Sequence, residues 1–185
     1  MNKQYTDIMI DIETLDTKPT AVILSIGAVA FDIETGETCP DTLYQKLDYK
    51  KQIDEGRTTS IETTLWWGQQ SDEAYCEAFF GEERLLSAII NLKKYFYNYA
   101  ADDCRVWAKS PSFDLVILKD AYDNDIAPWE FWQERDVRTF ADGQLTSVFV
   151  ACDKEPSHLP VEDCLVQVKG VCLTYKGLRE GKHGI

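Results

Sequence analysis

The sequence predicts an α/β protein in which a mixed β-sheet, with antiparallel first strands and later parallel strands, is flanked by helices. Three observations predict this class. A segment with period-two alternation lies near the start of the chain, two further strand-like segments follow it across short turns, and helical periodicities then alternate with strand-like segments. Strands joined by short turns pair antiparallel, whereas strands separated by a helix pair parallel.

The first three predicted strands are neighbours in sequence. Residues 7–13 carry isoleucine at every second position, so Asp11 and Glu13 should point to the same side of the strand. Residues 22–31 are almost wholly apolar and form the second strand, and a short turn leads to a third strand near residues 42–47. This part of the sheet should be antiparallel.

Apolar residues at steps of four and three predict the later helices, and short apolar runs predict the later strands. In chain order we expect a helix at 85–99, a strand at 104–109, a helix at 113–122, a loop at 125–129, a strand at 134–138, a loop at 152–157 and a last helix at 161–175. The apolar face of that helix should comprise Val161, Leu165, Val168, Cys172 and Tyr175. Residues 177–185 are expected to form a short flexible tail, which leaves a core of about 7–175 in a single domain spanning 1–185.

The charge balance limits how the protein could act on nucleic acid. Among 185 residues, 19 basic and 32 acidic side chains give a formal net charge of -13. This charge argues against a protein that holds nucleic acid on a broad basic face. It remains compatible with a nuclease whose bound cations screen the phosphate.

Cysteine usage and hydropathy predict the compartment. The six cysteines include no Cys-x-x-Cys pair, and with two histidines they do not match the spacing of a zinc site. We interpret them as small buried side chains in a reducing compartment. No basic and apolar leader precedes Asp7, and no apolar run approaches the roughly 20 residues of a membrane span. The expectation is a cytoplasmic protein, in the host cytoplasm if a phage encodes it, with no membrane partner.

Three carboxylates lie at positions that are unfavourable for a negative charge, either beside another acid or within an apolar run. Asp11 and Glu13 share one face of a strand, either as a solvated edge or as oxygen ligands for Mg²⁺ or Mn²⁺, whose charge offsets their repulsion. Asp114 lies within the apolar run 113–118, where an unpaired carboxylate is costly, although a helix N-terminus would also stabilise it.

A histidine and a further acid precede and open the last predicted helix. His158 is followed five positions later by Asp163. Neutral imidazole is the side chain best suited to accept a proton from water near pH 7. The alternative is an ordinary polar helix start with Pro160 in its first turn. The joint order of four carboxylates and one histidine favours the functional interpretation.

These residues resemble the DEDDh branch of 3′-to-5′ exonucleases, which has a ribonuclease H-like fold, and most closely its small phage and bacterial members similar to exodeoxyribonuclease VIII. The matching motifs are Asp11-Ile12-Glu13-Thr14, the Ser-Phe-Asp-Leu-Val-Ile-Leu stretch at 112–118, His158 with Asp163, and the segments 21–31, 65–67 and 135–139. The likeness covers about residues 7–175. The family usually has alanine where this chain has Pro160.

The resemblance implies two-metal hydrolysis of DNA or RNA from a free 3′ end, which releases nucleoside 5′-monophosphates. Two Mg²⁺ or Mn²⁺ ions and a homodimer are likewise implied. The residues carried over are, as metal ligands, Asp11, Glu13, Asp114 and Asp163; as general base, His158; and as substrate contacts, Thr14, Leu15 and Phe113.

Several alternatives stay open at this point. Trp66 and Trp67 are either core or dimer contacts or a platform for bases, and Lys109, Arg135 and Arg138 either meet phosphate or form surface ion pairs. For the whole chain, the alternatives are a catalytically weak nucleic-acid-binding or host-interaction protein on the same fold, which Pro160 and the acidic surface favour, and an acidic metal-binding or structural protein.

Overall fold

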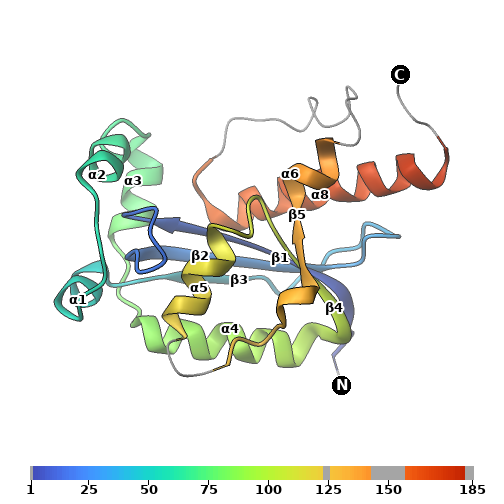
Figure 1. Cartoon of the computed structure of the whole chain (residues 1–185), viewed down its shortest axis with the longest axis horizontal. Coiled ribbons are helices and arrows are strands. Elements are labelled where there is room, and N and C mark those ends of the chain that lie inside the picture. Colours follow the sequence, from blue (N-terminus) through green and yellow to red (C-terminus); the bar gives the residue numbers. More distant parts are fainter. Residues whose placement is uncertain (1, 123–125, 143–156, 182–185) are drawn as a thin grey trace.

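A five-stranded mixed sheet forms the centre of the molecule (Figure 1). The computed structural model describes residues 2–122, 126–142 and 157–181. The strands lie in the order β3-β2-β1-β4-β5, and their bounds are β1 Tyr5–Thr14, β2 Ile23–Phe31, β3 Leu43–Lys46, β4 Ala100–Ala108 and β5 Glu134–Asp136. The pairs β1–β2 and β2–β3 are antiparallel, whereas β1–β4 and β4–β5 are parallel. The predicted mixed sheet is confirmed.

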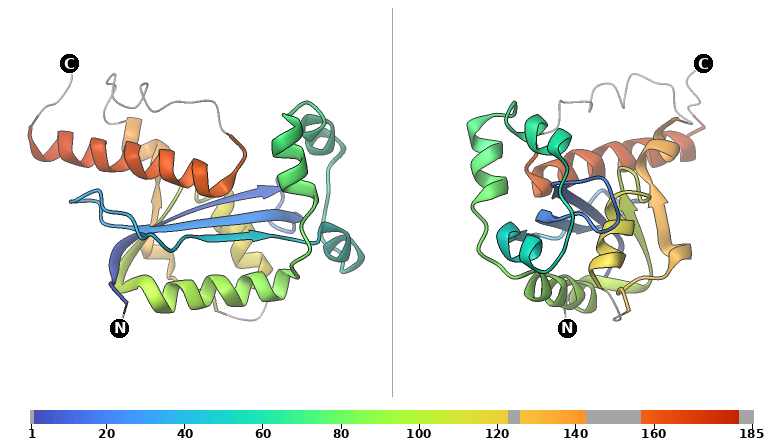
Figure 2. Two further views of the ribbon diagram at one scale, coloured as in Figure 1. Left: turned by 180° about the vertical axis from the view of Figure 1, so that it is seen from behind. Right: turned by 60° about the vertical axis from the view of Figure 1, so that its left-hand side comes forward.

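Helices cover both faces of this sheet. They are α1 Tyr49–Asp54, α2 Ile61–Trp67, α3 Asp72–Phe79, α4 Leu85–Tyr99, α5 Asp114–Ala121, α6 Val137–Asp142 and α8 Pro160–Arg179, with a 3₁₀ turn, η1, at Phe131–Gln133. Figures 1 and 2 show α8 across one face of the sheet and α4 across the other, with α2 and α3 beyond one end. None of the described helices has the length and apolar composition that a bilayer span requires.

Strand β1 is buried on both faces, not on one as its alternation predicted. Ile8, Ile10 and Ile12 join the core on the side of α4. On the other side, Met9 packs with residues of β2 and α8, including Val171. Helix α8 covers this second face of β1, and the alternation within β1 alone does not predict that contact. The polar positions of β1 therefore lie between layers rather than in solvent.

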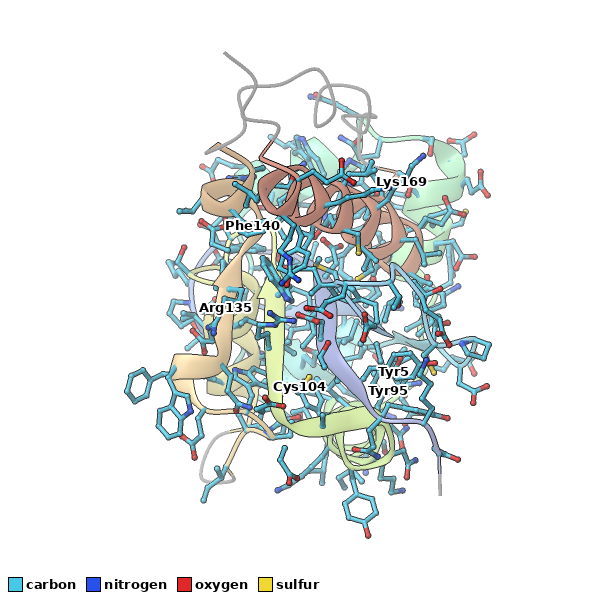
Figure 3. The ribbon with its side chains drawn as sticks, turned by 90° about the vertical axis from the view of Figure 1, so that its right-hand side faces the viewer. Tyr5, Tyr95, Cys104, Arg135, Phe140 and Lys169 are labelled. Atoms are coloured by element: carbon cyan, nitrogen blue, oxygen red, sulfur yellow. The ribbon has the colours of Figure 1, made fainter. Side chains whose placement is uncertain are left out.

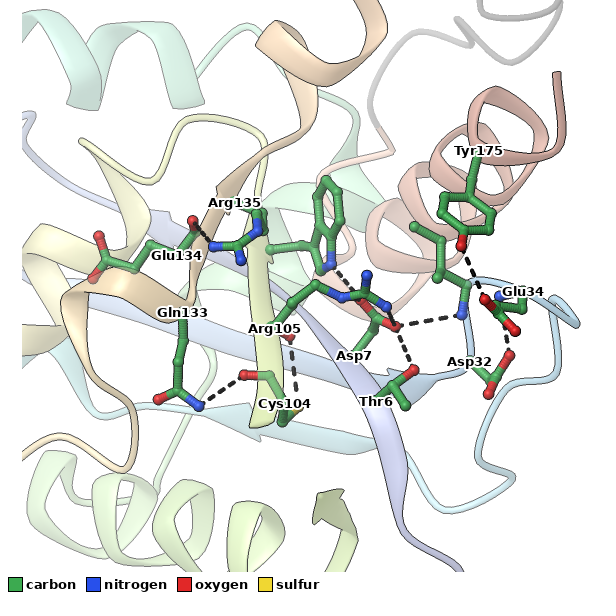
Figure 4. Close-up of polar contacts among 12 residues, drawn as sticks. Thr6, Asp7, Asp32, Glu34, Cys104, Arg105, Gln133, Glu134, Arg135 and Tyr175 are labelled. Carbon is green, nitrogen blue, oxygen red and sulfur yellow. Dashed lines mark hydrogen bonds and ion pairs between the residues drawn. The ribbon is translucent and has the colours of Figure 1, made fainter. Parts of the chain in front are cut away.

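Asp7 shows the consequence, because its side chain is fully buried. Its carboxylate accepts hydrogen bonds from Arg105 Nη2, Trp107 Nε1 and Thr6 Oγ1, each at 2.7 Å. Arg105 Nε lies 2.7 Å from Asp7 Oδ1, whereas Nη2 donates to Asp7 Oδ2. The ion pair is therefore bidentate (Figure 4). Figure 3 shows the nearby edge of the sheet, with Arg135 on β5 and Phe140 beneath α8. Burial of this carboxylate is compensated by the charged and neutral donors around it.

The largest local correction falls after β5. The predicted strand at 134–138 ends at Asp136, and α6 begins at Val137. The Asp136 carboxylate accepts hydrogen bonds from the backbone N–H groups of Arg138 and Thr139, which starts the helix. A short capping interaction therefore overrides the extended pattern. Strand β4 also begins at Ala100, earlier than predicted.

Helix α8 is longer than predicted, and its buried face differs from the predicted apolar face. It continues to Arg179, so the first residues of the expected tail are helical, while 182–185 lie outside the described residues. Leu165 is 41% exposed, whereas Cys164 and Val171 are fully buried. The predicted apolar face was wrong at Leu165, since the helix meets the sheet through neighbouring positions.

The short helices α1 and α3 are among those that have no counterpart in the predicted elements. Their start is set by caps: Asp48 accepts from the backbone N–H groups of Lys50 and Lys51, and Ser71 accepts from that of Ala74. Of the predicted loops, 126–129 is irregular as expected, while 125 and 152–156 lie outside the described residues.

The described cysteines are all free. Cys39, Cys104 and Cys164 are buried, as predicted, but Cys76 is exposed on α3.

Candidate active site

The site forms at the carboxyl end of β1, where α5 begins. Asp11 and Glu13 project from the same face of β1, and both are partly buried. Asp114 is the first residue of α5 and is only 5% exposed. Its Oδ1 accepts a hydrogen bond of 3.1 Å from the backbone N–H of Ile12. This bond ties the start of α5 to the strand that carries the other two acids.

The start of α8 supplies Asp163 and His158. The Asp163 carboxylate accepts hydrogen bonds from Ser157 N at 2.9 Å, Ser157 Oγ at 3.1 Å and His158 N at 3.0 Å. These bonds fold the preceding segment back over the first turn of the helix. His158 then has a left-handed backbone, with φ of 56°, and its Nδ1 lies 3.3 Å from Glu13 Oε1. Glu13, His158 and Asp163 each offer one ligand atom, all within 4.8 Å of one another.

Pro160 is accommodated by a glycine on the neighbouring strand. It is a buried residue at the first position of α8, where a missing N–H costs no helical hydrogen bond. A Cβ built on Gly27 of β2 would lie 2.6 Å from Pro160 Cβ and 2.7 Å from its carbonyl carbon. The absent side chain of Gly27 therefore lets the helix start approach the sheet. His158 lies beside Glu13 with Pro160 in place.

Burial and repulsion between like charges make three of the carboxylates, Asp11, Glu13 and Asp114, hard to ionise, because they raise the pKa of each. Burial raises the pKa of Asp11 well above its usual range, and the charges of Asp114 and Glu13 raise it further. Burial also raises the pKa of Glu13, although the hydrogen bond from His158 opposes this. For Asp114, burial raises the pKa to about 7. The site thus gathers more negative charge than its own donors offset.

This donor set fits hard divalent cations. Oxygen ligands suit Mg²⁺ and Mn²⁺, and a bound cation reverses the cost of clustered carboxylates. The Asp11 carboxylate accepts a 3.0 Å hydrogen bond from Gln167 Nε2, a neutral donor that leaves its charge uncompensated. Gln167 is 7% exposed, and its Oε1 has no hydrogen-bond partner.

A hollow of about 480 Å³ opens beside Glu13 and His158. It is lined by Ile12, Glu13, Thr14, Thr17, Glu62, Thr63, Trp66, Phe113 and His158. Thr14 and Phe113, two of the three expected substrate contacts, line this hollow. Leu15 does not: it is 3% exposed and packs beneath the hollow with Trp67 and Val22. The expected contact between the Leu15 side chain and a base is not available in this structure, because the chain turns Leu15 into the core.

Trp66 and Trp67 differ in position: one is a core residue and the other lines the hollow. Trp67 is fully buried and donates a 2.9 Å hydrogen bond from Nε1 to the Thr14 carbonyl. Trp66 is 40% exposed, and its ring meets the His158 ring edge-on at 4.8 Å between centroids. Only Trp66 therefore faces the hollow.

Gln167 and Arg138 complete the surroundings of the acids. Gln167 was not anticipated, although it lies four residues after Asp163 and so on the same side of the helix. The charge of Arg138 opposes the rise in the pKa of Asp114. Arg135 instead donates to the backbone carbonyls of Trp132 and Glu134, away from the site.

Known proteins share this chain's sequence pattern and fold. A curated exodeoxyribonuclease of Enterobacteria phage T4 is 27% identical, over 72% of this chain and 69% of the phage protein. The fold is similar to E. coli exonuclease I in complex with a dA16 oligonucleotide, with a TM-score of 0.66, 13% identity and coverage of 97% of this chain. S. pombe Pop2p in its Mg²⁺- and Mn²⁺-bound form gives a TM-score of 0.63 at 12% identity, over 98% of this chain and 86% of that one.

This chain spans 42% of the length of the exonuclease I chain. At these identities the structural likeness shows the fold, which is ribonuclease H-like, as the resemblance in sequence implied. The sequence model described as the 3′-5′ exoribonuclease Rv2179c-like domain matches residues 6–173, which is nearly the whole chain. The chain therefore belongs to the family of 3′-5′ exoribonuclease Rv2179c-like domains.

Proposed function

We propose that this protein is a divalent-cation-dependent 3′-5′ exonuclease that releases nucleoside 5′-monophosphates from DNA or RNA with a free 3′ end. The observation that carries the proposal is the convergence of acids from β1, α5 and α8, with His158, beside a hollow with aromatic walls. Membership of a 3′-5′ exoribonuclease family supports it independently.

Asp11, Glu13, Asp114 and Asp163 would hold two divalent ions, Mg²⁺ or Mn²⁺. When bound, such ions neutralise phosphate charge and make water a stronger nucleophile near pH 7. The backbone N–H of Ile12 and the amide of Gln167 keep Asp114 and Asp11 oriented towards this space.

His158 is the proposed general base. A proton accepted by its imidazole ring creates a positive charge, which Glu13 stabilises because its Oε1 lies 3.3 Å from Nδ1. The rings of Trp66 and Trp67 meet the imidazole edge-on, with centroids 4.8 and 5.8 Å away. These contacts on one side and the acids on the other restrict the ring's rotation.

The hollow would take the terminal nucleoside. Trp66 and Phe113 offer aromatic surfaces, and base stacking on such surfaces contributes about 1–3 kcal/mol per base. Of the described residues that line it, none is a lysine or arginine. Stacking rather than phosphate pairing should therefore hold the substrate end.

The test is shortening of 5′-labelled DNA and RNA oligonucleotides of matched sequence, with the released unlabelled mononucleotides separated by chromatography, in Mg²⁺, Mn²⁺ or EDTA. We expect cation-dependent shortening from the 3′ end, lost in Asp11→Asn and Asp163→Asn and kept in Asp54→Asn, an exposed acid on α1. Comparable cleavage by Asp11→Asn would refute the assignment. Binding without cleavage by the wild type would favour a nucleic-acid-binding protein on the same fold.

Two further parts of the proposal rest on the sequence, the compartment on its cysteine usage and the homodimer on its resemblance to the family. The protein is proposed to act in the cytoplasm and as a homodimer. Light scattering after gel filtration tests the second, and a monomer at micromolar concentration contradicts it.

A further inference from the structure

We propose that Glu13, His158 and Asp163 form a site for a nitrogen-binding transition-metal ion such as Zn²⁺, and that its occupation stops catalysis. The site differs from the proposed magnesium sites because it recruits the imidazole as a ligand. The binding part rests on the local geometry, and the inhibitory part rests on the proposed function, in which His158 is the base.

The three ligand groups are already brought together. Their donor atoms lie within 4.8 Å of one another, and His158 Nδ1 lies 3.3 Å from Glu13 Oε1. A carboxylate–imidazole contact of this length needs little rearrangement to share a cation between the two atoms. The imidazole therefore points at the acids, and not away from them.

The segment that carries the histidine is held from several sides. Its backbone N–H donates to Asp163 Oδ2 at 3.0 Å. Its ring lies edge-on to those of Trp66 and Trp67. Hollows open on two sides of it, one lined by Thr14 and Phe113 and the other by residues of α3 and α8. An ion can thus reach the three donor atoms from solvent.

Ligand chemistry separates the two kinds of cation. Mg²⁺ takes oxygen ligands in near-octahedral geometry and keeps several waters. Zn²⁺ prefers imidazole nitrogen together with carboxylate oxygen, in tetrahedral geometry. Two acids and one imidazole supply three ligands and leave a fourth position for water. The same cluster therefore leaves His158 unbound with Mg²⁺ and binds it with Zn²⁺.

Occupation by Zn²⁺ is incompatible with base catalysis. A neutral imidazole has one available lone pair, and once Nδ1 donates it to a metal ion the other nitrogen carries the proton. If Nδ1 is protonated beforehand, binding releases that proton to solvent. His158 then has no lone pair left with which to take a proton from water.

The binding experiment uses the full chain, stripped with EDTA and desalted, and Co²⁺ as a spectroscopic substitute for Zn²⁺. Co²⁺ should quench tryptophan fluorescence, because Trp66 contacts the ligand imidazole, and Zn²⁺ should displace it. The test variant is His158→Asn, since asparagine tolerates the left-handed backbone at this position. We expect its Co²⁺ affinity to fall at least about tenfold, the scale seen when metal-site partners are removed, with Mg²⁺-induced stabilisation retained.

Matched controls exclude other sites. Cys76→Ser removes the exposed cysteine, and His183→Ala removes the second of the two histidines in the sequence, which lies outside the described residues. Both should bind Co²⁺ like the wild type. Wild-type affinity in His158→Asn, or loss of binding in Cys76→Ser with a thiolate–cobalt band in the wild-type spectrum, overturns the site. A melting temperature of metal-free His158→Asn close to that of the wild type shows that the variant is folded.

The inhibition experiment adds Zn²⁺ to wild-type protein in saturating Mg²⁺. Because Glu13 and Asp163 are shared with the proposed Mg²⁺ sites, turnover should stop with a midpoint equal to the dissociation constant from a Co²⁺ competition carried out in the same Mg²⁺ concentration, and full turnover at saturating Zn²⁺ overturns the inhibitory role. If no Mg²⁺-dependent turnover exists at all, the proposed function fails, and the spectroscopic titration still decides whether the site exists.

Discussion

Two residues with unusual backbone angles stand directly before the helices of the site. Ser110, with φ of 122°, precedes α5 and Asp114, and His158, with φ of 56°, precedes α8 and Asp163. Among the described residues other than glycine, these are the two with positive φ. Such conformations cost free energy and persist only where the surroundings enforce them. Hydrogen bonds to Asp163 enforce the second.

The buried Asp114 gives a prediction for stability against pH in EDTA. Its pKa is about 7 in the folded protein against an ordinary value of 3.8. Between these values the folded protein holds a proton that the unfolded chain has lost, so the free energy of unfolding falls as pH rises. Asp114→Asn lacks this penalty. Its melting temperature, relative to wild type, should therefore rise from pH 4 to pH 7 and then level off.

The size of this effect can be read calorimetrically, since 1 kcal/mol corresponds to roughly 2–4 °C for a protein of this length. Asp54→Asn, in an exposed position, should show no such trend. Mn²⁺ at pH 7 should stabilise the wild type more than Asp114→Asn. A difference between the two proteins that is constant across pH contradicts the burial argument.

Sequence could supply the acids of the site but not their supporting partners. Asp11, Glu13 and Asp114 carry a signal because charge in an apolar setting is unusual. Gln167 carries none, because a glutamine on a helix is ordinary until the packing places it beside a particular carboxylate. For Trp66 the sequence left a core contact and a base platform open, and only the packing places its ring against the imidazole.

At the scale of elements, the contact of α8 with β2 sets the position of Asp163. Gly27→Ala should force the start of α8 away from the sheet, because the new Cβ would lie 2.6–2.9 Å from Pro160 atoms. We expect a loss of about 1–3 kcal/mol in the free energy of unfolding and, with the site displaced, at least a roughly tenfold fall in turnover. Chemical denaturation and the oligonucleotide assay measure the two effects.

Pro160→Ala is the matched comparison and should change both quantities little, because alanine also suits the first turn of a helix. It should not rescue Gly27→Ala, since the carbonyl carbon and oxygen at position 160 remain at 2.7 and 2.9 Å. Full recovery in the double variant would show that the side chain of Pro160, and not the backbone, sets the spacing.

The ion pair of Asp7 and Arg105 joins β1 to β4 beneath α8, and its loss should be costly. Arg105→Gln leaves a buried carboxylate without its counter-charge, so we expect destabilisation of about 3 kcal/mol. Arg135→Gln, on edge strand β5, removes only bonds to backbone carbonyls and should stay within about 0.5 kcal/mol of wild type. Urea denaturation compares them. Asp7→Asn combined with Arg105→Gln should be more stable than Arg105→Gln alone; the reverse order argues against the charge as the cause.

The elements differ in how well the sequence predicted them, because some depend on local periodicity and others on contacts between residues far apart in the chain. Strands β1 and β2 and helix α4 follow from local periodicity and were predicted closely. The second buried face of β1 depends on α8, more than a hundred residues away, and no local pattern announces it. The start of α6 depends on the carboxylate of Asp136. In the sequence this residue cannot be told apart from any other polar residue of a turn, so its capping role was not predicted.

At the scale of the molecule, a net charge of -13 and a hollow without described lysine or arginine predict weak dependence of binding on salt. The His158→Asn variant, which should not cleave, allows binding to be measured in Mg²⁺. On a plot of the logarithm of its affinity for a single-stranded oligonucleotide against the logarithm of the salt concentration, the slope should be less than about 2 in magnitude, equivalent to fewer than about three phosphate contacts. Trp66→Ala in that background should weaken binding at every salt concentration alike. Fluorescence anisotropy measures both, and a slope expected for six or more contacts contradicts stacking as the main attraction.

The last feature to consider is the order of the acids along the chain. Asp11, Glu13 and Asp114 precede Asp163 and His158, which lie at the start of α8, the final described helix. Proteins are synthesised from the N-terminus at about 5–20 residues per second, and a domain generally folds as a unit. A ribosome-bound chain therefore lacks two of the five proposed site residues until the start of its last described helix has been synthesised. Under the proposed function, the growing polypeptide therefore completes its set of metal ligands and its general base only after the start of α8 has been synthesised.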